Sequence, residues 1–492
     1  MIFRENSLIV HVRIQSSSDF TRLKNMIIFL MLGYVMAESM TIPNNTIVVQ
    51  LKVSGNQNSY VKPWNIGASF SVSGSGLLLD SNMHVLTNFH VVKLATRITV
   101  LYRDQQTYGR VVRGSRILDM ALVELDTPLV YNYSSLSCID NDSIATSTLF
   151  RDDIPKKDEQ VIVQGFPVGS EDLSLTKGVV SRIIYNKLTL LHVQVDAAIN
   201  AGNSGGPGFD SNGNVVGIVA SKLASVSIDN IGFLISVPVL RLFLRRDFRD
   251  IHCLGVTLET MTNPWTRQLF GVEHGVRVSQ ILHAVENHTL QVNDIILKVA
   301  GHAISTKGKF HWRLDEMMSL YFLVQVTFQT SIEMQVKRKN DILDLNVTIP
   351  WYEQIFIPYE PNPRGIIVSG LVFAPISVML QAGLLQNYGH DVSPAVYRET
   401  RMFPGHEMVV LVNVLTDSAN SEIEFDSSSM VVKTVNDVSV KNLTHFHELV
   451  NECHDGFIRF GMEKHGLIVI HARNMSETNQ RIANTYHCFN VY

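Results

Sequence analysis

One serine lies between glycines in the segment Asp196–Pro207, which reads Asp-Ala-Ala-Ile-Asn-Ala-Gly-Asn-Ser-Gly-Gly-Pro. Ser204 is therefore expected in a tight loop whose small residues let another backbone approach closely. The main-chain N–H groups of Gly202, Asn203 and Ser204 lie where they can converge on one point and stabilise an oxyanion. The alternative for an isolated pattern of this kind is an ordinary turn rich in Gly and Asn.

A histidine and an aspartate precede this loop in the chain, each beside an apolar segment. His90 lies near the end of Val85–Val92, and imidazole is the side chain best suited to take a proton near neutral pH. Asp119 stands just before an apolar strand and can orient the imidazole. The order His, Asp, Ser is that of chymotrypsin and differs from the orders in subtilisin and α/β-hydrolases. We therefore predict a catalytic triad of His90, Asp119 and Ser204, although lone histidines are usually structural.

The remaining histidines and glycine-rich motifs do not indicate a second catalytic or ligand-binding site. His84 is expected in a turn and His192 on the face of a strand, so neither is the predicted base. The 18 histidines show no His-Glu-x-x-His spacing, and no phosphate-binding loop is present, so no metal and no cofactor are predicted.

The elements that must position the triad are short β-rich segments separated by Gly, Asn and Asp. Between Thr46 and Leu244 the predicted strands are Ile47–Val53, Gly67–Val72, Gly76–Leu79, Ile98–Leu101, Ala121–Leu125, Val161–Gln164, His192–Asp196, Val215–Ala220 and Gly232–Ile235. This spacing is typical of an all-β barrel or sandwich. The amphipathic pattern of Val239–Asp250 predicts a helix that closes the domain.

Two weakly similar units follow, at residues 251–350 and 351–492. Each contains a strand that ends in a polar turn, at Ile295–Gly301 and at Met430–Asp437, followed by an apolar-periodic segment that can be helical.

The motifs together resemble the HtrA/Deg (protease Do-like) branch of trypsin-fold serine proteases. The segments that carry the resemblance are Thr-Asn-x-His-Val-Val at 87–92, Asp-Met-Ala-Leu-Val at 119–123, Gly-Asn-Ser-Gly-Gly-Pro at 202–207, Ser73–Gly76, Gly165–Gly169, Thr176–Arg182 and, in the last unit, Gly370–Phe373. The resemblance covers about residues 46–492. It implies a mainly β fold: a trypsin-like double β-barrel at 39–250, then two PDZ-like α+β modules in the plant-type Deg arrangement.

The resemblance also implies the activity and the partners. We expect an ATP-independent serine endopeptidase that degrades unfolded or damaged proteins and assembles as a homo-oligomer of trimers, with Trp64 and Phe70 as possible contacts. Leu254, Gly255 and Val256 would form the PDZ loop that binds peptide C-termini. The alternative for these three residues is an ordinary turn into a strand. The alternative function is a catalytically silent PDZ scaffold or chaperone.

Two features distinguish this sequence from the digestive serine proteases of the trypsin fold. The protease part contains one cysteine, Cys138, so the disulfide that those enzymes place around the histidine cannot form. Ala198 stands six residues before Ser204, where a trypsin-like specificity would need a carboxylate. We therefore predict cleavage after small or medium apolar residues.

Length and composition agree with several soluble-type domains. The 492 residues fit two to four domains, and 17% charged with 46% hydrophobic residues argues against wholesale disorder. The formal charge of −4 and the lack of a basic cluster argue against a nucleic-acid partner. Four cysteines cannot build a disulfide framework, although Cys453 and Cys488 can pair in an oxidising compartment.

Residues 1–38 are predicted to be a signal or targeting segment. The apolar run 26–37 is too short to span a bilayer but fits the core of a signal peptide, which favours the secretory pathway or an extracellular location. The alternative is an Arg- and Ser-containing presequence for an organelle such as the mitochondrion. No membrane span is expected in the mature chain.

Overall fold

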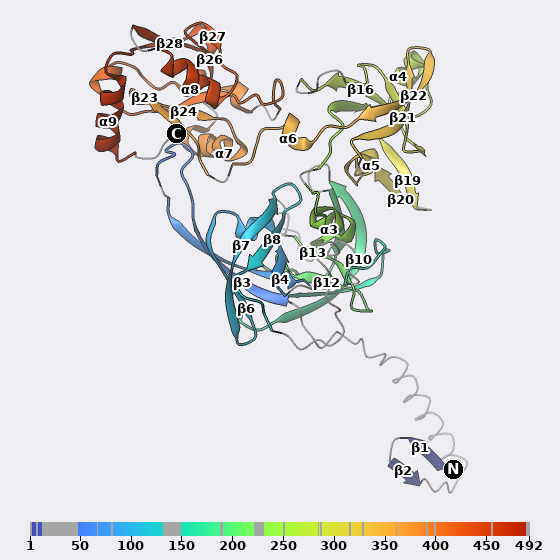
Figure 1. The fold of residues 1–492 in the computed structure, drawn as a ribbon. Helices are drawn as coiled ribbons and strands as arrows, with labels where there is room; N and C mark the ends of the chain where they lie inside the picture. Colours follow the sequence, from blue (N-terminus) through green and yellow to red (C-terminus); the bar gives the residue numbers. More distant parts are fainter. Residues whose placement is uncertain are drawn as a thin grey trace.

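The computed structural model describes residues 2–5, 8–11 and 48–488, except 66, 80–81, 131–148, 187–189, 221–230, 249–250, 284, 286–287, 314–315, 327–328, 361, 390–391, 398–399 and 454–455. Most of the predicted leader, and Cys138, lie outside the described residues. Near the N-terminus, β1 (Ile2–Glu5) and β2 (Leu8–His11) form an antiparallel pair. Two barrels and two further modules follow (Figure 1).

The first barrel closes in the order β3-β4-β5-β8-β7-β6. Its elements are β3 (Val48–Asn56), β4 (Ser69–Leu78), β5 (His84–Thr87), α2 (Phe89–Val92), β6 (Ala95–Tyr102), β7 (Gln105–Ser115) and β8 (Met120–Leu125). The apolar side chains of Val49, Leu51 and Val53 lie on one face of β3 and are fully buried, whereas Lys52 on the other face is exposed.

The second barrel closes in the order β10-β11-β14-β13-β12-β9. Its elements are β9 (Gln160–Gly165), β10 (Ser174–Asn186), β11 (Leu190–Val195), β12 (Pro207–Phe209), β13 (Val215–Val219) and β14 (Gly232–Ser236), followed by α3 (Val237–Leu244). The predicted closing helix is real but starts two residues earlier, at Val237, and ends at Leu244.

The break that the sequence predicts between two strands of the first barrel is absent from the structure. The segments predicted as two strands, Gly67–Val72 and Gly76–Leu79, form the single strand β4. Gly74 and Gly76 lie inside this strand, at points where other parts of the barrel approach the main chain so closely that a side chain would not fit. An added Cβ would lie 2.6 Å from a methyl group of Val91 at Gly74, and 2.4 Å from one of Val85 at Gly76. These glycines therefore serve packing rather than a turn.

The first module comprises the elements between the second barrel and residue 350. They are β15 (Val256–Thr260), α4 (Pro264–Phe270), β16 (Val276–Ile281), β17 (Ile295–Val299), β18 (His302–Ala303), β19 (Lys309–Arg313), β20 (Glu316–Ser319), α5 (Leu320–Val326), β21 (Ser331–Arg338) and β22 (Asp341–Thr348). Its main sheet has the order β15-β16-β17-β21-β22, and β18 pairs with β17.

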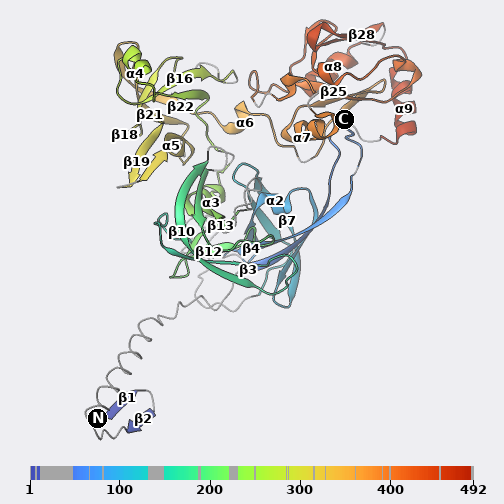
Figure 2. The same ribbon diagram turned by 180° about the vertical axis from the view of Figure 1, so that it is seen from behind.

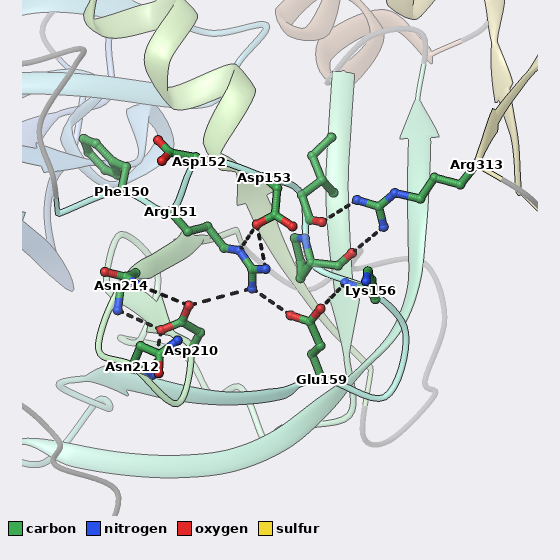
Figure 3. Close-up of polar contacts among 12 residues, drawn as sticks. Phe150, Arg151, Asp152, Asp153, Lys156, Glu159, Asp210, Asn212, Asn214 and Arg313 are labelled. Atoms are coloured by element: carbon green, nitrogen blue, oxygen red, sulfur yellow. Dashed lines mark hydrogen bonds and ion pairs between the residues drawn. The ribbon is translucent and has the colours of Figure 1, made fainter.

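This module is attached to the second barrel by polar contacts. Arg313 of β19 donates to the main-chain carbonyls of Ile154 and Pro155 (Figure 3). The hydroxyl of Tyr185 on β10 donates to the side chain of Gln325 on α5. The β19–β20 hairpin and α5 therefore dock on the barrel.

The segment that receives Arg313 is itself held by a buried arginine. Arg151, whose side chain is 13% exposed, bonds Asp153 and Glu159 at 2.7 Å and approaches Asp210 at 3.8 Å (Figure 3). Because several carboxylates hold the largely buried guanidinium of Arg151, its geometry is fixed. The segment therefore presents the carbonyls of Ile154 and Pro155 rigidly to the first module.

The C-terminal module comprises the elements from residue 351 onward. They are α6 (Tyr352–Ile355), β23 (Ile366–Val368), β24 (Leu371–Pro375), α7 (Val378–Tyr388), β25 (Val409–Val414), β26 (Val432–Val435), β27 (Val438–Ser439), α8 (Leu443–Asn451), β28 (Phe457–Met462), β29 (Leu467–His471) and α9 (Met475–Tyr486), with short 3₁₀ turns between them. Its sheets have the orders β23-β24-β25 and β27-β26-β28-β29.

The β3–β4 hairpin reaches this C-terminal module (Figure 1). Tyr60 and Val61 at the hairpin tip are buried in the same apolar cluster as Leu380 and Leu384 of α7. Trp64 packs against this cluster, so part of its surface is covered within the chain itself.

The predicted fold class is confirmed: the chain is mainly β, with two closed barrels followed by modules of mixed strands and helices. Among the described residues, no disulfide involves Cys253, Cys453 or Cys488, so the pairing of Cys453 with Cys488 is not formed in this structure. Among the described residues, no helix combines the length and apolar character needed to cross a membrane.

Candidate active site

His90 lies on the short helix α2 directly after strand β5, and Asp119 lies in the turn before β8. The imidazole Nδ1 is 2.7 Å from Asp119 Oδ2 and 3.0 Å from Oδ1, and the main-chain N–H of His90 donates to Oδ1 at 3.0 Å. Because an ionised carboxylate only accepts, Nδ1 carries the proton of the neutral ring and Nε2 is left to accept one.

The backbone of Asp119 is also held by the histidine segment. Its carbonyl accepts from Asn88 Nδ2 at 3.0 Å and from the N–H of Phe89 at 3.1 Å. Asp119 has a φ of 52°, a left-handed conformation that such contacts must stabilise. Asp119 and His90 are therefore fixed to one another by both side-chain and main-chain hydrogen bonds.

Ser204 lies in the loop between β11 and β12 and is 9% exposed. Within this loop the N–H of Asn203 donates to Asn200 O at 3.1 Å, and that of Gly205 donates to Val219 O at 3.0 Å. The N–H groups of Gly202 and Ser204 have no acceptor among the described residues. Of the three groups predicted to line an oxyanion hole, these two are free to bind an oxygen, and that of Asn203 is engaged in the loop.

Ser75 on β4 connects the Ser204 loop to the first barrel. Its hydroxyl donates to Gly202 O at 2.7 Å and accepts from the N–H of Phe166 at 2.8 Å. Its N–H donates to Ser204 O at 2.8 Å, and its carbonyl accepts from Thr87 Oγ1 at 2.8 Å. Ser75 is fully buried, so each of these bonds is made without competition from water.

The three predicted triad residues thus come from both barrels to one junction. His90 and Asp119 are directly bonded. Ser204 reaches the same junction through Ser75 and Thr87, and Thr87 is three residues before His90. Among the described residues, no hydrogen bond joins the imidazole to the Ser204 hydroxyl.

Sequence reasoning did not assign a role to Ser75 or Thr87. The available signal was a hydroxyl-bearing residue next to apolar strand residues. The side chains of Ser75 and Thr87 are both fully buried, and Thr87 ends β5 immediately before the histidine segment. A buried hydroxyl must find partners, but the sequence does not say which ones.

In the region that would select the substrate side chain, an alanine occupies the position six residues before Ser204, and the nearest described carboxylate in the chain is that of the exposed Asp196. Ala198 is exposed, and its carbonyl accepts from Thr176 Oγ1 at 3.0 Å. The carboxylate of Asp196, two residues earlier, accepts from the N–H of Val179 at 2.6 Å. Residues 221–230 lie outside the described part of the chain.

Leu254 and Gly255 lead into β15, which begins at Val256 and, among the described strands, pairs with β16 alone. The carbonyl of Gly255 accepts from the N–H of Leu282, and that of Leu254 accepts from His288 Nε2 at 2.8 Å. The N–H of Leu290 donates to His288 Nδ1, so Nε2 carries the proton, and burial lowers the pKa of His288. In the described part of the chain, the N–H groups of Leu254 and Gly255 have no acceptor.

The corresponding segment of the C-terminal module is arranged differently. Gly370 has a φ of 87° and lies in a tight turn between β23 and β24. Because β24 pairs with β23 on one side and β25 on the other, it has no free edge for a peptide.

The two histidines set aside by sequence reasoning lie in strands. His84 begins β5 opposite Glu124, so it is in a strand rather than the expected turn, and burial lowers its pKa. His192 in β11 meets Phe233 edge-on, on the face of the second barrel. In the described residues, no three His, Cys, Asp or Glu side chains gather in a way that could hold a metal ion.

Two family models match the chain. A trypsin-like peptidase domain matches residues 74–218, which include His90, Asp119 and Ser204, and a PDZ domain matches residues 357–491.

Similar proteins cover most of the chain. Protease Do-like 2, chloroplastic, from Arabidopsis thaliana is 26% identical over 459 residues, which cover 89% of this chain and 73% of that protein. Putative protease Do-like 3, mitochondrial, from the same organism is 28% identical over 461 residues, covering 89% and 78%. A solved structure of the HtrA-type protease AlgW with a decapeptide is 22% identical, with a TM-score of 0.46, and covers 65% of this chain and 98% of that one.

The substitution Ser75→Ala tests whether the junction aligns Ser204. It removes two buried hydrogen bonds and leaves Gly202 O and the Phe166 N–H without a partner, at a cost of about 1–3 kcal/mol. We expect the rate of covalent labelling by a fluorophosphonate probe to fall about tenfold. Ser73→Ala, two residues earlier on β4, is the matched control, because the Ser73 side chain makes no hydrogen bond among the described residues. Wild-type labelling of Ser75→Ala would show that this contact does not align the loop.

Proposed function

This chain is a serine endopeptidase of the Do-like (HtrA/Deg) type, and we propose that it hydrolyses unfolded or damaged proteins without ATP through a triad of Ser204, His90 and Asp119. The observation that carries the proposal is the hydrogen bond that His90 Nδ1 donates to Asp119 Oδ2 at 2.7 Å. It orients the ring so that Nε2 can take the proton of a nucleophile.

In the proposed mechanism, Ser204 Oγ attacks the scissile carbonyl while His90 Nε2 takes its proton. A tetrahedral intermediate forms, and its oxyanion accepts from the N–H groups of Gly202 and Ser204. His90 then gives the proton to the leaving amine, which departs and leaves an acyl-enzyme. Water then attacks the ester while His90 takes its proton, and as the second tetrahedral intermediate collapses His90 returns that proton to Ser204 Oγ, which releases the carboxylic product. Asp119 stays ionised and stabilises the imidazolium.

Peptide binding is proposed at the first module. The free edge of β15 can add a peptide as a further strand, and the N–H groups of Leu254 and Gly255 can receive its terminal carboxylate. This assigns recognition of peptide C-termini to residues 254–256 and not to the paired strand β24 of the C-terminal module.

Compartment and assembly are also proposals. Relatives are named chloroplastic and mitochondrial, which favours an organelle over the secretory pathway. A homo-oligomer of trimers remains the proposed assembly. Trp64 already packs within the chain against the C-terminal module, which makes the partly exposed Phe70 the stronger candidate for a contact between subunits.

The substitution Ser204→Ala tests the nucleophile. Loss of a triad nucleophile costs a factor on the order of 10⁴ or more in rate, so hydrolysis of casein should become undetectable while the fold is kept. The far-ultraviolet circular dichroism of the variant, unchanged from wild type, is the control for folding. Labelling of the wild type by a fluorophosphonate, absent in Ser204→Ala, separates an enzyme from a catalytically silent scaffold. A variant that still digests casein would refute the assignment.

The cleavage preference is a second test. With an alanine at position 198, six residues before Ser204, we expect cuts after small or medium apolar residues. The sites are read by sequencing the products of an unfolded protein substrate, with Ser204→Ala as the blank for contaminating proteases. Predominant cutting after Lys or Arg would contradict this preference.

A third test concerns the first module. Full-length Ser204→Ala, which cannot digest its ligand, is titrated with a fluorescent peptide that ends in an apolar residue, and binding is followed by anisotropy. Hydrogen bonds to a charged group contribute about 1.5–3 kcal/mol, so the same peptide with an amidated C-terminus should bind about tenfold or more weakly. Equal affinity of the two peptides would exclude a carboxylate-binding loop.

A further inference from the structure

Tyr359 lies in the linker between α6 and β23, far in sequence from the predicted triad, yet its ring contacts the first barrel. It meets the ring of Phe89 edge-on, with 5.4 Å between centroids and an angle of 79°. Phe89 directly precedes His90 on α2, and Figure 2 shows α2 on the side of the barrel that faces the C-terminal module.

The same ring contacts the segment that carries the acid. The guanidinium of Arg116 lies 5.6 Å from the centre of the Tyr359 ring. The carbonyl of Arg116 accepts from the N–H of Asp119 at 3.2 Å, which closes the turn that presents the carboxylate. One side chain from the C-terminal part of the chain thus touches the neighbours of both His90 and Asp119.

Phe89 is also closely packed against β7. An added Cβ at Gly114 of β7 would lie 2.9 Å from the Phe89 ring, so both β7 and Tyr359 restrict the position of this ring. The N–H of Phe89 donates to Asp119 O at 3.1 Å. Displacement of the Phe89 ring would therefore disturb the hydrogen bond between the main-chain N–H of Phe89 and the carbonyl of Asp119.

The linker that carries Tyr359 is anchored at several points. The carbonyl of Glu360 accepts from Tyr60 at the β3–β4 hairpin tip, at 2.9 Å. Arg364 bonds the carboxylates of Glu360 and Glu407. The position of the ring is therefore set jointly by the hairpin tip and the C-terminal module.

The contribution of Tyr359 comes from its ring. The hydroxyl is buried and has no hydrogen-bond partner in the described part of the structure. Burial also raises the pKa of this phenol, so the group stays neutral at working pH. Removing the hydroxyl while keeping the ring should leave the contacts with Phe89 and Arg116 in place.

We propose that Tyr359 is a positioning residue for the His90–Asp119 pair, through which the docked C-terminal module supports catalysis. The ring supports Phe89 and Arg116, so α2 and the turn before β8 keep the spacing at which Asp119 holds His90 Nδ1. This inference rests on the proposed triad but concerns a contact outside it.

The experiment compares Tyr359→Ala with Tyr359→Phe in the full-length protein. With a short peptide substrate, Tyr359→Ala should lower kcat about tenfold while KM stays within about twofold, because geometry at the reacting atoms is lost and not ground-state binding. Labelling of Ser204 by a fluorophosphonate should slow in parallel. Tyr359→Phe should restore both values to near wild type.

Tyr388→Ala is the matched control. Tyr388 is a half-buried tyrosine on α7 whose ring packs at an angle of 38° against Phe425 inside the C-terminal module, with 5.1 Å between centroids. Its truncation removes a ring contact inside the module and leaves the Tyr359 ring against Phe89, so kcat should stay near wild type. An unchanged or higher kcat in Tyr359→Ala, or an equal fall in Tyr388→Ala, would overturn the proposal. Failure of the triad itself is recognised separately, by activity remaining in Ser204→Ala.

Discussion

The hydrogen bonds of Ser75 are the constraint on which the active-site arrangement depends. This serine lies on a strand of the first barrel, while Gly202, Ser204 and Phe166 belong to the second. Two barrels packed through apolar surfaces alone could slide by fractions of an ångström, because hydrophobic contact is not directional. Buried hydrogen bonds are directional and costly to leave unmade. They therefore fix the register in which the Ser204 loop meets the strand that leads to His90.

The same physical logic extends to the modules beyond the barrels. Arg313 of the first module uses two main-chain carbonyls, whose position is held by the ion pairs of Arg151. The C-terminal module is held differently, by the apolar hairpin tip around Tyr60 and by the linker around Tyr359. Among the described residues, the first module thus has strand β15 paired on one side, whereas the C-terminal module has β24 paired on both sides and packs beside α2.

Much of the fold could be predicted from alternating apolar positions and turn residues. The strand segments around Leu51, Val123, Val163 and Ile218 were located because each is apolar and bounded by turns. Strand β7 was missed because its residues Gln105–Ser115 are mostly polar and exposed. The break predicted within β4 was wrong because its glycines accommodate neighbouring side chains, which local sequence patterns do not reveal.

The sequence by itself determined the fold class and the candidate catalytic residues His90, Asp119 and Ser204, because residue type, spacing and chain order can be read without knowing the tertiary structure. It also determined that no carboxylate stands at Ala198. Only the tertiary structure decided how Ser75 joins the barrels, which N–H groups of the Ser204 loop stay free, which module keeps an open edge, and that Tyr359 lies beside Phe89. These depend on contacts between residues far apart in the chain, whose geometry is set by packing and by the need to satisfy buried polar groups.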